Sequence, residues 1–478
     1  MGTASMRIRT VLASAAVLLL ALLALPAAAG ALPPEYGFAW PGGPYVWQPV
    51  PGPTDALTQF SLLAPGPAGS LYAATGDQNG GYWTVVRVLT ADGSLAASAP
   101  PAKGPHGYSV TLSGLASDAG RNAVVAGTEY SPKGGDVFVA KVSPAGKVLW
   151  QKTWDGAAHS EDSAKAVAVD AAGNIYVAGA TVGTGKYIDA LVLKYSPKGV
   201  LKWKYVYKTA QADQFVSLGV DSRGGVYVTG TVNDSYAGGD IATLRLDPLG
   251  HKVWLQKLTA FGVQFSAYRL KVKGSGVYVT GFLFSPDTHP VVLKYSLTGK
   301  RLWAYGHSMD DAVISPGGMA VDPAGRVVFT LNSRGVNEDD PDLIGAKVLV
   351  LTPGGKLYRT GIVDGTWDPN TPREALCLDT TVDSAGRIYC AGRIDTAAYS
   401  MANNASVTSF PPAATEPWAA DRIWRYDSPA SGTSDRFAAV LALGAGEVYA
   451  AGKRTTPGAV PERAQPVVLR LGTAPTNN

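Results

Sequence analysis

The residues suited to metal chemistry lie in one acidic run. Glu338, Asp339, Asp340 and Asp342 are carboxylates, and oxygen ligands of this kind are the ones that calcium prefers. Their spacing does not match an EF-hand loop, whose ligand positions and glycine are fixed. A solvated acidic loop is the alternative interpretation. Calcium is the one cofactor that these residues leave open.

Aromatic side chains form a second candidate group in the same part of the chain. Trp367, Tyr399 and Trp418 would suit stacking on a sugar ring or a peptide. Together with Asp368 and Arg373 they are the candidate ligand-binding residues. The alternative is that these aromatic rings are buried within their own loops.

Motifs of the common hydrolases and nucleotide-binding proteins are absent from the sequence. It contains no Gly-x-Ser-x-Gly, no His-Glu-x-x-His, no Walker loop and no Rossmann glycine string after a strand. Five histidines are scattered, and the short stretch His159–Asp162 is only weak support for a triad. We therefore assign no catalytic residue.

Cys377 and Cys390 are the only two cysteines. They flank a turn at Asp383–Gly386, and their spacing places them on one face of a hairpin, opposite or one diagonal apart. In an exported protein this arrangement predicts a disulfide. The alternative is a pair of buried free thiols, and neither arrangement points to catalysis or to zinc, which needs more ligands.

A ten-residue stretch, Asp170–Gly179, recurs along the chain and determines the architecture that must position these residues. Its eight copies end at residues 75, 127, 179, 230, 281, 331, 392 and 452. A regular period in this range indicates a propeller, a solenoid or another repeat array. The longer last two intervals locate additional residues in units 6 and 7.

A second motif follows in each unit, and Asp189–Gly199 is its clearest copy. Asp-x-x-Gly and Ser/Asp-Pro-x-Gly are hairpin turns, because Asp or Ser bonds the nearby backbone and Gly accepts positive φ. Each unit thus contains four short antiparallel strands, which is one propeller blade. The other copies of the second motif are Trp83–Gly93, Asp136–Gly146, Asp240–Gly250, His289–Gly299, Gly345–Gly355, Asp421–Ser431 and Gln465–Pro475.

Several repeated residues have structural explanations. A tryptophan follows the second turn in four units, and we expect it to pack between neighbouring blades. The aspartates of the first turn shape that turn, since one carboxylate per hairpin is not a cation site. Asp162 and Asp213 precede the turn aspartate by eight residues, and we expect them to cap a loop.

The repeat strings resemble those of the bacterial SBBP β-propeller repeat family. The resemblance rests on Asp-x-x-Gly-Asn-Ile-Tyr-Val-Ala-Gly and Lys-x-Ser-Pro-x-Gly-Lys-x-x-Trp, and it covers residues 57–475. It implies a propeller and implies no activity. The family name stands for seven blades, whereas the chain has eight units, so eight blades are predicted and seven are the alternative.

The N-terminal part of the chain is expected to be processed and then to close the ring. Residues 1–29 have the charged, apolar and small-residue regions of a signal peptide, with an uncleaved anchor as the alternative. Residues 30–56 include Gly43-Pro-Tyr-Val-Trp47, which resembles a fourth strand, and the last unit lacks one. We expect this strand to complete blade 8 of the propeller, residues 57–478. A loose tail is the alternative.

Charge limits the kinds of partner. Removal of residues 1–29 takes away two arginines, so the mature charge is (41 − 2) − 37 = +2. A nearly neutral chain without a basic stripe does not predict nucleic-acid binding. No further apolar run is long enough to span a membrane. We expect a monomer, secreted or located in the periplasm or cell envelope.

Link lengths differ between the two faces of the predicted ring. The links between second and third strands and the links between successive blades lie on the same face of the ring. In units 6–8 these links are long, and they include Asn332–Ile344 and Arg393–Ala420. Binding residues concentrate on such loops, although drift in surface loops is the alternative. The expected function is non-enzymatic binding of a protein or a cell-surface glycan through these loops.

Two other functional classes remain open. A propeller enzyme is one, and the eight units with Gly-Lys-x-x-Trp also resemble quinoprotein dehydrogenases, which implies a pyrroloquinoline quinone and calcium. The cysteines here are 13 residues apart rather than adjacent, which departs from that pattern. A lyase or a glycosidase fits equally well. An envelope assembly scaffold is the other class.

Overall fold

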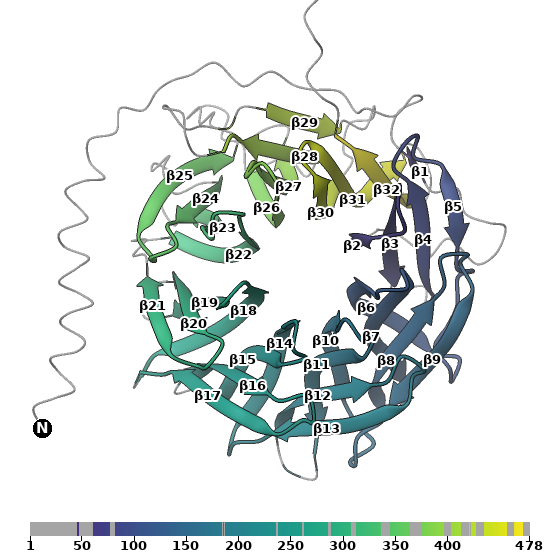
Figure 1. The fold of residues 1–478 in the computed structure, drawn as a ribbon, viewed down its shortest axis with the longest axis vertical. Helices are drawn as coiled ribbons and strands as arrows, with labels where there is room; N and C mark the ends of the chain where they lie inside the picture. The colour runs from purple at the N-terminus through teal and green to yellow at the C-terminus, as the bar shows by residue number, and fades with distance from the viewer. Residues whose placement is uncertain are drawn as a thin grey trace, which may run out of the picture.

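The chain forms a ring of eight four-stranded antiparallel blades (Figure 1). The computed structural model describes residues 45–46, 61–76 and 82–471, except 184, 186, 236–237, 261, 285–287, 307–311, 336–344, 364–374, 396–402, 413–419, 421, 427–434 and 457–462. The prediction of eight blades is confirmed. Among the described residues no helix is long and apolar enough to cross a membrane.

The first strand of each blade lies at the ring centre, and the fourth lies at the rim (Figure 1). Blade 1 consists of β2 (Leu62–Pro65), β3 (Ser70–Gly76), β4 (Trp83–Leu89) and β5 (Leu95–Ser98), and blade 2 of β6 (Ser109–Ser117), β7 (Ala123–Ser131), β8 (Gly134–Val142) and β9 (Val148–Trp154). Blade 3 consists of β10 (Asp162–Val169), β11 (Ile175–Val182), β12 (Ile188–Tyr195) and β13 (Leu201–Tyr207), and blade 4 of β14 (Ala212–Val220), β15 (Val226–Ser235), β16 (Gly238–Leu246) and β17 (Lys252–Leu258).

The remaining blades follow the same order until the last. Blade 5 consists of β18 (Gln264–Lys273), β19 (Gly276–Phe284), β20 (Thr288–Ser296) and β21 (Arg301–Gly306), and blade 6 of β22 (Ala312–Val321), β23 (Val327–Gly335), β24 (Gly345–Leu351) and β25 (Leu357–Val363). Blade 7 consists of β26 (Ala375–Val382), β27 (Ile388–Asp395), β28 (Asn403–Phe410) and β29 (Arg422–Tyr426), and blade 8 of β30 (Arg436–Gly444), β31 (Glu447–Thr456), β32 (Arg463–Arg470) and β1 (Tyr45–Val46).

The ring is closed by the N-terminal strand. Tyr45 lies opposite Val468 and Val46 lies opposite Val467, so β1 is the fourth strand of blade 8. This confirms the closure predicted from the unpaired N-terminal strand. Because closure pairs the outer side of β32, it removes an edge that an open array would expose.

The hydrophobic core lies between blades rather than within them. The two middle strands of a blade are almost wholly buried, since their side chains pack on neighbouring blades from both faces. One cluster joins Tyr176 of blade 3 to Phe215 and Val226 of blade 4. Outer strands such as β13 alternate exposed and half-buried residues. Stability therefore depends on contacts that cross from one blade to the next.

The repeated tryptophans connect each blade to the following one, as expected. The indole Nε1 of Trp203 donates to the carbonyl of Pro248, in the third-to-fourth turn of blade 4, at 3.1 Å. Equivalent bonds join Trp150 to Pro197, Trp254 to Leu297 and Trp303 to Pro353. The turn glycine of the next blade lies over the indole, where an added Cβ would approach to between 2.5 and 2.8 Å. The tryptophan is thus a packing residue with a second, hydrogen-bonding role.

The repeated aspartates also have the predicted structural roles. The Oδ1 atom of Asp170 accepts from the backbone nitrogen of Asn174 at 2.8 Å, and Oδ2 accepts from the Tyr176 hydroxyl at 3.0 Å. Asp213 accepts from the backbone nitrogens of Thr209 and Asn233, which confirms it as a loop cap. These carboxylates are occupied by local hydrogen bonds.

Blade 7 differs from its prediction. Arg393–Ala420 was expected to be one long loop, and Asp421–Ser431 a third strand. The structure instead places the third strand at β28, inside that range, and Arg422–Tyr426 is the fourth strand. The cause is composition: Ser406 and Thr408 are buried in β28 at the positions where blade 3 has Leu191 and Leu193, so the apolar pattern of β28 is weak.

The predicted disulfide is present. Cys377 and Cys390 are bonded, with their Cα atoms 5.7 Å apart. Cys377 lies opposite Gly392 and Cys390 lies opposite Thr380, so the pair is diagonal across β26 and β27. Both cysteines are buried. The disulfide joins the two inner strands of blade 7, β26 and β27.

Candidate functional site

The two faces of the ring differ in the length of the links that connect the strands. First-to-second and third-to-fourth turns form one face, which we name the turn face; the other links form the variable-link face. On the variable-link face the links range from 132–133 to 336–344 and 364–374. On the turn face they are short except 411–421, between β28 and β29. This exception corrects the prediction that all long links share one face.

The candidate residues named from the sequence lie outside the described residues. These are the ligand-binding set Trp367, Asp368, Arg373, Tyr399 and Trp418 and the acidic set Glu338, Asp339, Asp340 and Asp342. Their flanking strands assign 396–402 to the variable-link face and 411–421 to the turn face. Both sets stay predictions.

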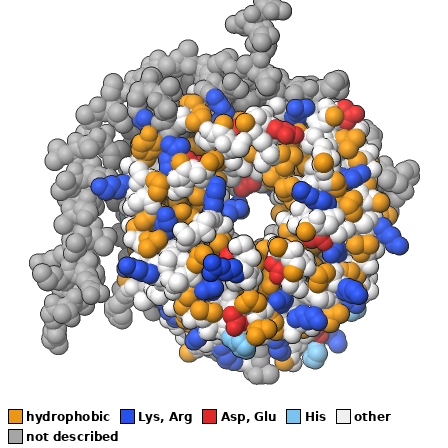
Figure 2. Space-filling view, viewed as in Figure 1, with side chains coloured by type: hydrophobic (Ala, Val, Ile, Leu, Met, Phe, Trp, Pro, Cys, Tyr) orange, Lys and Arg blue, Asp and Glu red, His pale blue; other side chains and the backbone are white. Residues whose placement is uncertain are grey.

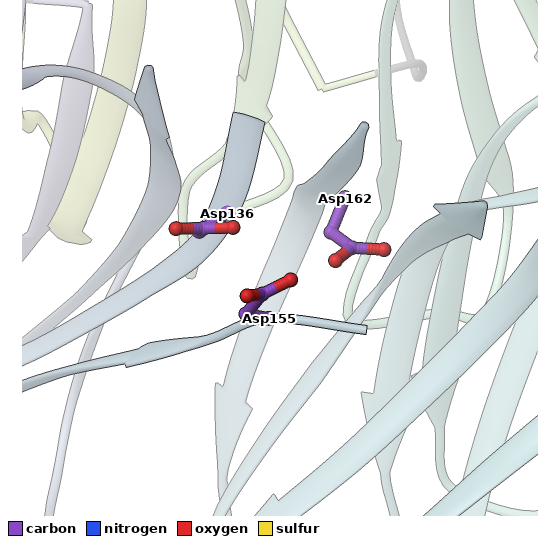
Figure 3. A group of neighbouring side chains, drawn as sticks. All are labelled: Asp136, Asp155 and Asp162. Atoms are coloured by element: carbon purple, nitrogen blue, oxygen red, sulfur yellow. The ribbon is translucent and has the colours of Figure 1, made fainter. Parts of the chain in front are cut away.

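A cluster of carboxylates lies on the variable-link face between blades 2 and 3 (Figure 3). Asp136 stands near the start of β8, Asp155 follows β9, and Asp162 begins β10. Each offers an oxygen within 4.8 Å of the others. The convergence arises because the starts of third and first strands and the end of the fourth strand all meet on this face.

Further acidic groups border the cluster. Glu129 lies directly opposite Asp136 across β7 and β8 and is fully buried. Its Oε1 accepts from the backbone nitrogens of His106 and Tyr108, and its Oε2 lies 3.1 Å from Nδ1 of His106. Glu161 accepts from the backbone nitrogen of Gly135 at 3.3 Å. The site therefore concentrates negative charge in a protein that is nearly neutral overall.

Asp162 is the structural member of the cluster. It is 1% exposed, and its carboxylate accepts from the backbone nitrogens of Gly156 and Val182, which confirms it as a loop cap. Burial raises the pKa of Asp162, and these hydrogen bonds oppose the shift. Asp162 thus keeps the loop 155–161 in place beside Asp136.

Asp136 is the chemically distinctive member. Burial, followed by the charges of Asp155 and Asp162, raises the pKa of Asp136 to about 6. A carboxylate with this pKa exchanges its proton near neutral pH and can act as an acid or a base. It can equally supply one oxygen to a cation, together with Asp155 and Asp162.

In the next two blades the aspartate that corresponds to Asp136 is paired with a lysine. Asp189 and Asp240 occupy the place of Asp136, and lysines pair with them: Lys208 at 3.8 Å and Lys257 at 3.3 Å. Asp155 stands five residues after Trp150, as Lys208 does after Trp203. Blade 2 therefore carries an acid where blade 3 carries the neutralising base. Comparing the repeats with one another would have revealed this exchange, whereas motif searches missed it.

The histidine of the stretch His159–Asp162 contacts a different acid from the one a triad requires. Nδ1 of His159 lies 2.6 Å from Oδ2 of Asp155, and both side chains are largely exposed. Asp162 instead caps backbone nitrogens. The geometry gives no support to a triad here, in agreement with the weak sequence signal.

Replacing Asp136 with Asn is expected to stabilise the protein at neutral pH. The folded pKa of Asp136 exceeds its ordinary value, so the folded state binds the proton more tightly and stability falls as pH rises from about 4 to about 6. The variant should gain on the order of 1 kcal/mol at pH 7, or about 2 °C in melting temperature, and nothing at pH 4. Thermal denaturation across pH measures this.

Asp240→Asn is the matched control, because it removes the same repeat position from a lysine pair. It should leave stability unchanged or lower it. If both variants shift the melting temperature alike at pH 7, the electrostatic account of the cluster is wrong.

The matches between this chain and known proteins are distant ones to solved structures. No protein-family model and no curated protein matches the chain. The structure is similar to a periplasmic gluconolactonase from Pseudomonas aeruginosa, with TM-score 0.43 and 15% identity over 63% of this chain and 84% of that one. It is also similar to the propeller domain of the Trilobed protease from Pyrococcus furiosus (TM-score 0.40, 9% identity, 74% and 95% covered). Prolyl oligopeptidase B from Galerina marginata gives TM-score 0.45 and 8% identity over 84% of this chain and 55% of that one.

Proposed function

We propose that this protein is an exported, non-enzymatic propeller of the SBBP repeat type that binds a protein or a cell-surface glycan through its variable-link face. The observation that carries the proposal is the difference between the faces. The scaffold repeats closely, while the links of one face vary from blade to blade. Rigid scaffolds with variable loops on one side are a common design for recognition.

Two further observations support export and the choice of face. A disulfide forms where the compartment is oxidising, as outside the cytosol. The acidic cluster of Asp136, Asp155 and Asp162 lies on the same face as the long links of blades 6 and 7. A partner on this face would meet a local concentration of negative charge, which favours basic groups on its side.

Exchanging single links tests the proposal. The link 396–402 or the link 336–344 would be replaced by a Gly-Ser linker, leaving β27, β28 and the other strands intact. Capture of partners from the host's secreted and envelope fractions is expected to weaken about tenfold or more with either replacement. The matched control replaces 411–421, which is also long but belongs to the turn face, and should retain binding. Loss of binding only with the control would place the site on the turn face.

A glycoside-hydrolysing activity is the second candidate, and Asp136 is the observation that favours it. Paired carboxylates with one raised pKa are what acid–base cleavage of a glycosidic bond requires. Turnover in a screen of glycans, abolished by Asp136→Asn and retained by Asp240→Asn, would replace the binding proposal with this one.

A further inference from the structure

The central channel contains a pair of basic side chains on the inner strand β18. Arg269 and Lys271 lie two residues apart on this strand, on the side away from the Phe265, Ala267 and Leu270 cluster. In Figure 2 the ring is open at its centre, and basic side chains border the opening near β18 and β22. The pair is far from the carboxylates of blades 2 and 3 along the ring.

Among the residues that the structure describes, one carboxylate opposes these two cations. Nη2 of Arg269 lies 3.7 Å from Oδ1 of Asp379, which stands on the inner strand of blade 7. The other oxygen of Asp379 accepts from the backbone nitrogen of Val440 at 3.1 Å. The described residues offer no hydrogen bond to the buried Nε of Arg269. They also offer Lys271 no hydrogen bond or salt bridge, so positive charge is in excess.

The surroundings of Lys271 make this excess costly. Lys271 is exposed and stands on β18, the inner strand of blade 5. Desolvation lowers the pKa of Lys271, and the charge of Arg269 lowers it further, although Asp379 opposes both. An anion placed between the two side chains would offset the repulsion and supply the missing hydrogen-bond acceptors.

The inner strand of blade 6, β22, lies between the inner strands that carry Arg269 and Asp379. β22 lies tightly against blade 7, where a Cβ on Gly318 would meet the Thr380 nitrogen at 2.1 Å. On its other side a narrow cleft separates it from blade 5, and Tyr268, the neighbour of Arg269, lines that cleft.

We propose that the channel binds a small oxyanion, a carboxylate or a phosphate, between Arg269 and Lys271. Arg269 supplies the fork of donors that matches an oxyanion, and Lys271 adds a point charge. Asp379 holds Arg269 in place and competes with the ligand for it. The proposal does not depend on the variable-link face, which uses different residues.

Titration calorimetry of the mature protein with inorganic phosphate, and separately with acetate, tests the site. Saturable binding of either anion is expected, and the two titrations distinguish the phosphate source from the carboxylate source. Lys271→Gln should weaken the binding about tenfold, because a charge-assisted hydrogen bond is lost. Asp379→Asn should strengthen it, because the competing charge disappears while an oxygen remains for Val440.

The matched control is Lys273→Gln, on the same strand. Lys273 donates to the carbonyl of Val321 at 2.7 Å and is solvent-exposed, so its removal should change affinity by less than about twofold. Absence of saturable binding to both anions would overturn the proposal. Equal losses with Lys271→Gln and Lys273→Gln would also overturn it, since they would indicate general charge attraction.

Discussion

Gly250→Ala is expected to destabilise the propeller by about 2–5 kcal/mol, because it combines a left-handed backbone with a clash between blades. Gly250 has φ of +91°, and an added Cβ would lie 2.8 Å from Cδ2 of Trp203. The indole cannot withdraw without losing its hydrogen bond to Pro248. Chemical denaturation of the variant and the parent measures the loss.

A control separates the two causes. Gly274 also has positive φ, at +57°, but no atom lies within 4 Å of its added Cβ. Gly274→Ala should therefore cost only the backbone share, about 1–2 kcal/mol. In the Gly250→Ala background, Trp203→Ala should cost less than it does alone, because the clash has already disrupted the contact. Equal effects of the two glycine variants would refute the inter-blade lock.

Deleting residues 36–51 is expected to lower stability by roughly 2–3 kcal/mol and to promote self-association. The deletion removes β1 and uncovers the outer edge of β32. Val467 and Val468 lie at this edge and are fully buried in the intact chain. Melting temperature and light scattering measure the two effects. The loss should exceed that of most single substitutions, because it opens the ring.

Adding the segment back as a synthetic peptide provides the control. A peptide of residues 36–51 should raise the melting temperature of the shortened chain and leave the complete chain unchanged, since only the former has a vacant edge. No response to the peptide, or an unchanged melting temperature after deletion, would show that β1 contributes nothing to closure.

The fold could be predicted from the sequence because each blade repeats the same local signals. Turn aspartates such as Asp170, turn glycines such as Gly250 and the outer tryptophans recur at fixed offsets in several blades, and each has the same physical role in the blades that contain it. The prediction was wrong in blade 7, where buried Ser and Thr replace aliphatic residues in β28. Hydrophobic patterning cannot detect a strand whose buried positions are occupied by polar residues.

The sites depend on residues that are distant in sequence. Arg269 and Asp379 meet across blade 6, and no pattern within one repeat indicates this contact. Asp136, Asp155 and Asp162 are closer in sequence. Their cluster stands out only when blade 2 is compared with later blades, where lysines neutralise Asp189 and Asp240. Departures from the repeat, compared position by position, are therefore the most informative signals in this chain.

The central claim is that partners bind the variable-link face, and a cross-linking footprint tests it most directly. Lys103, Lys133 and Lys208 are exposed on that face, whereas Lys147, Lys198 and Lys300 are exposed on the turn face. In the captured complex, mass spectrometry should find cross-links to the partner from the first three lysines and not from the second three. Cross-links confined to Lys147, Lys198 and Lys300 would contradict the account.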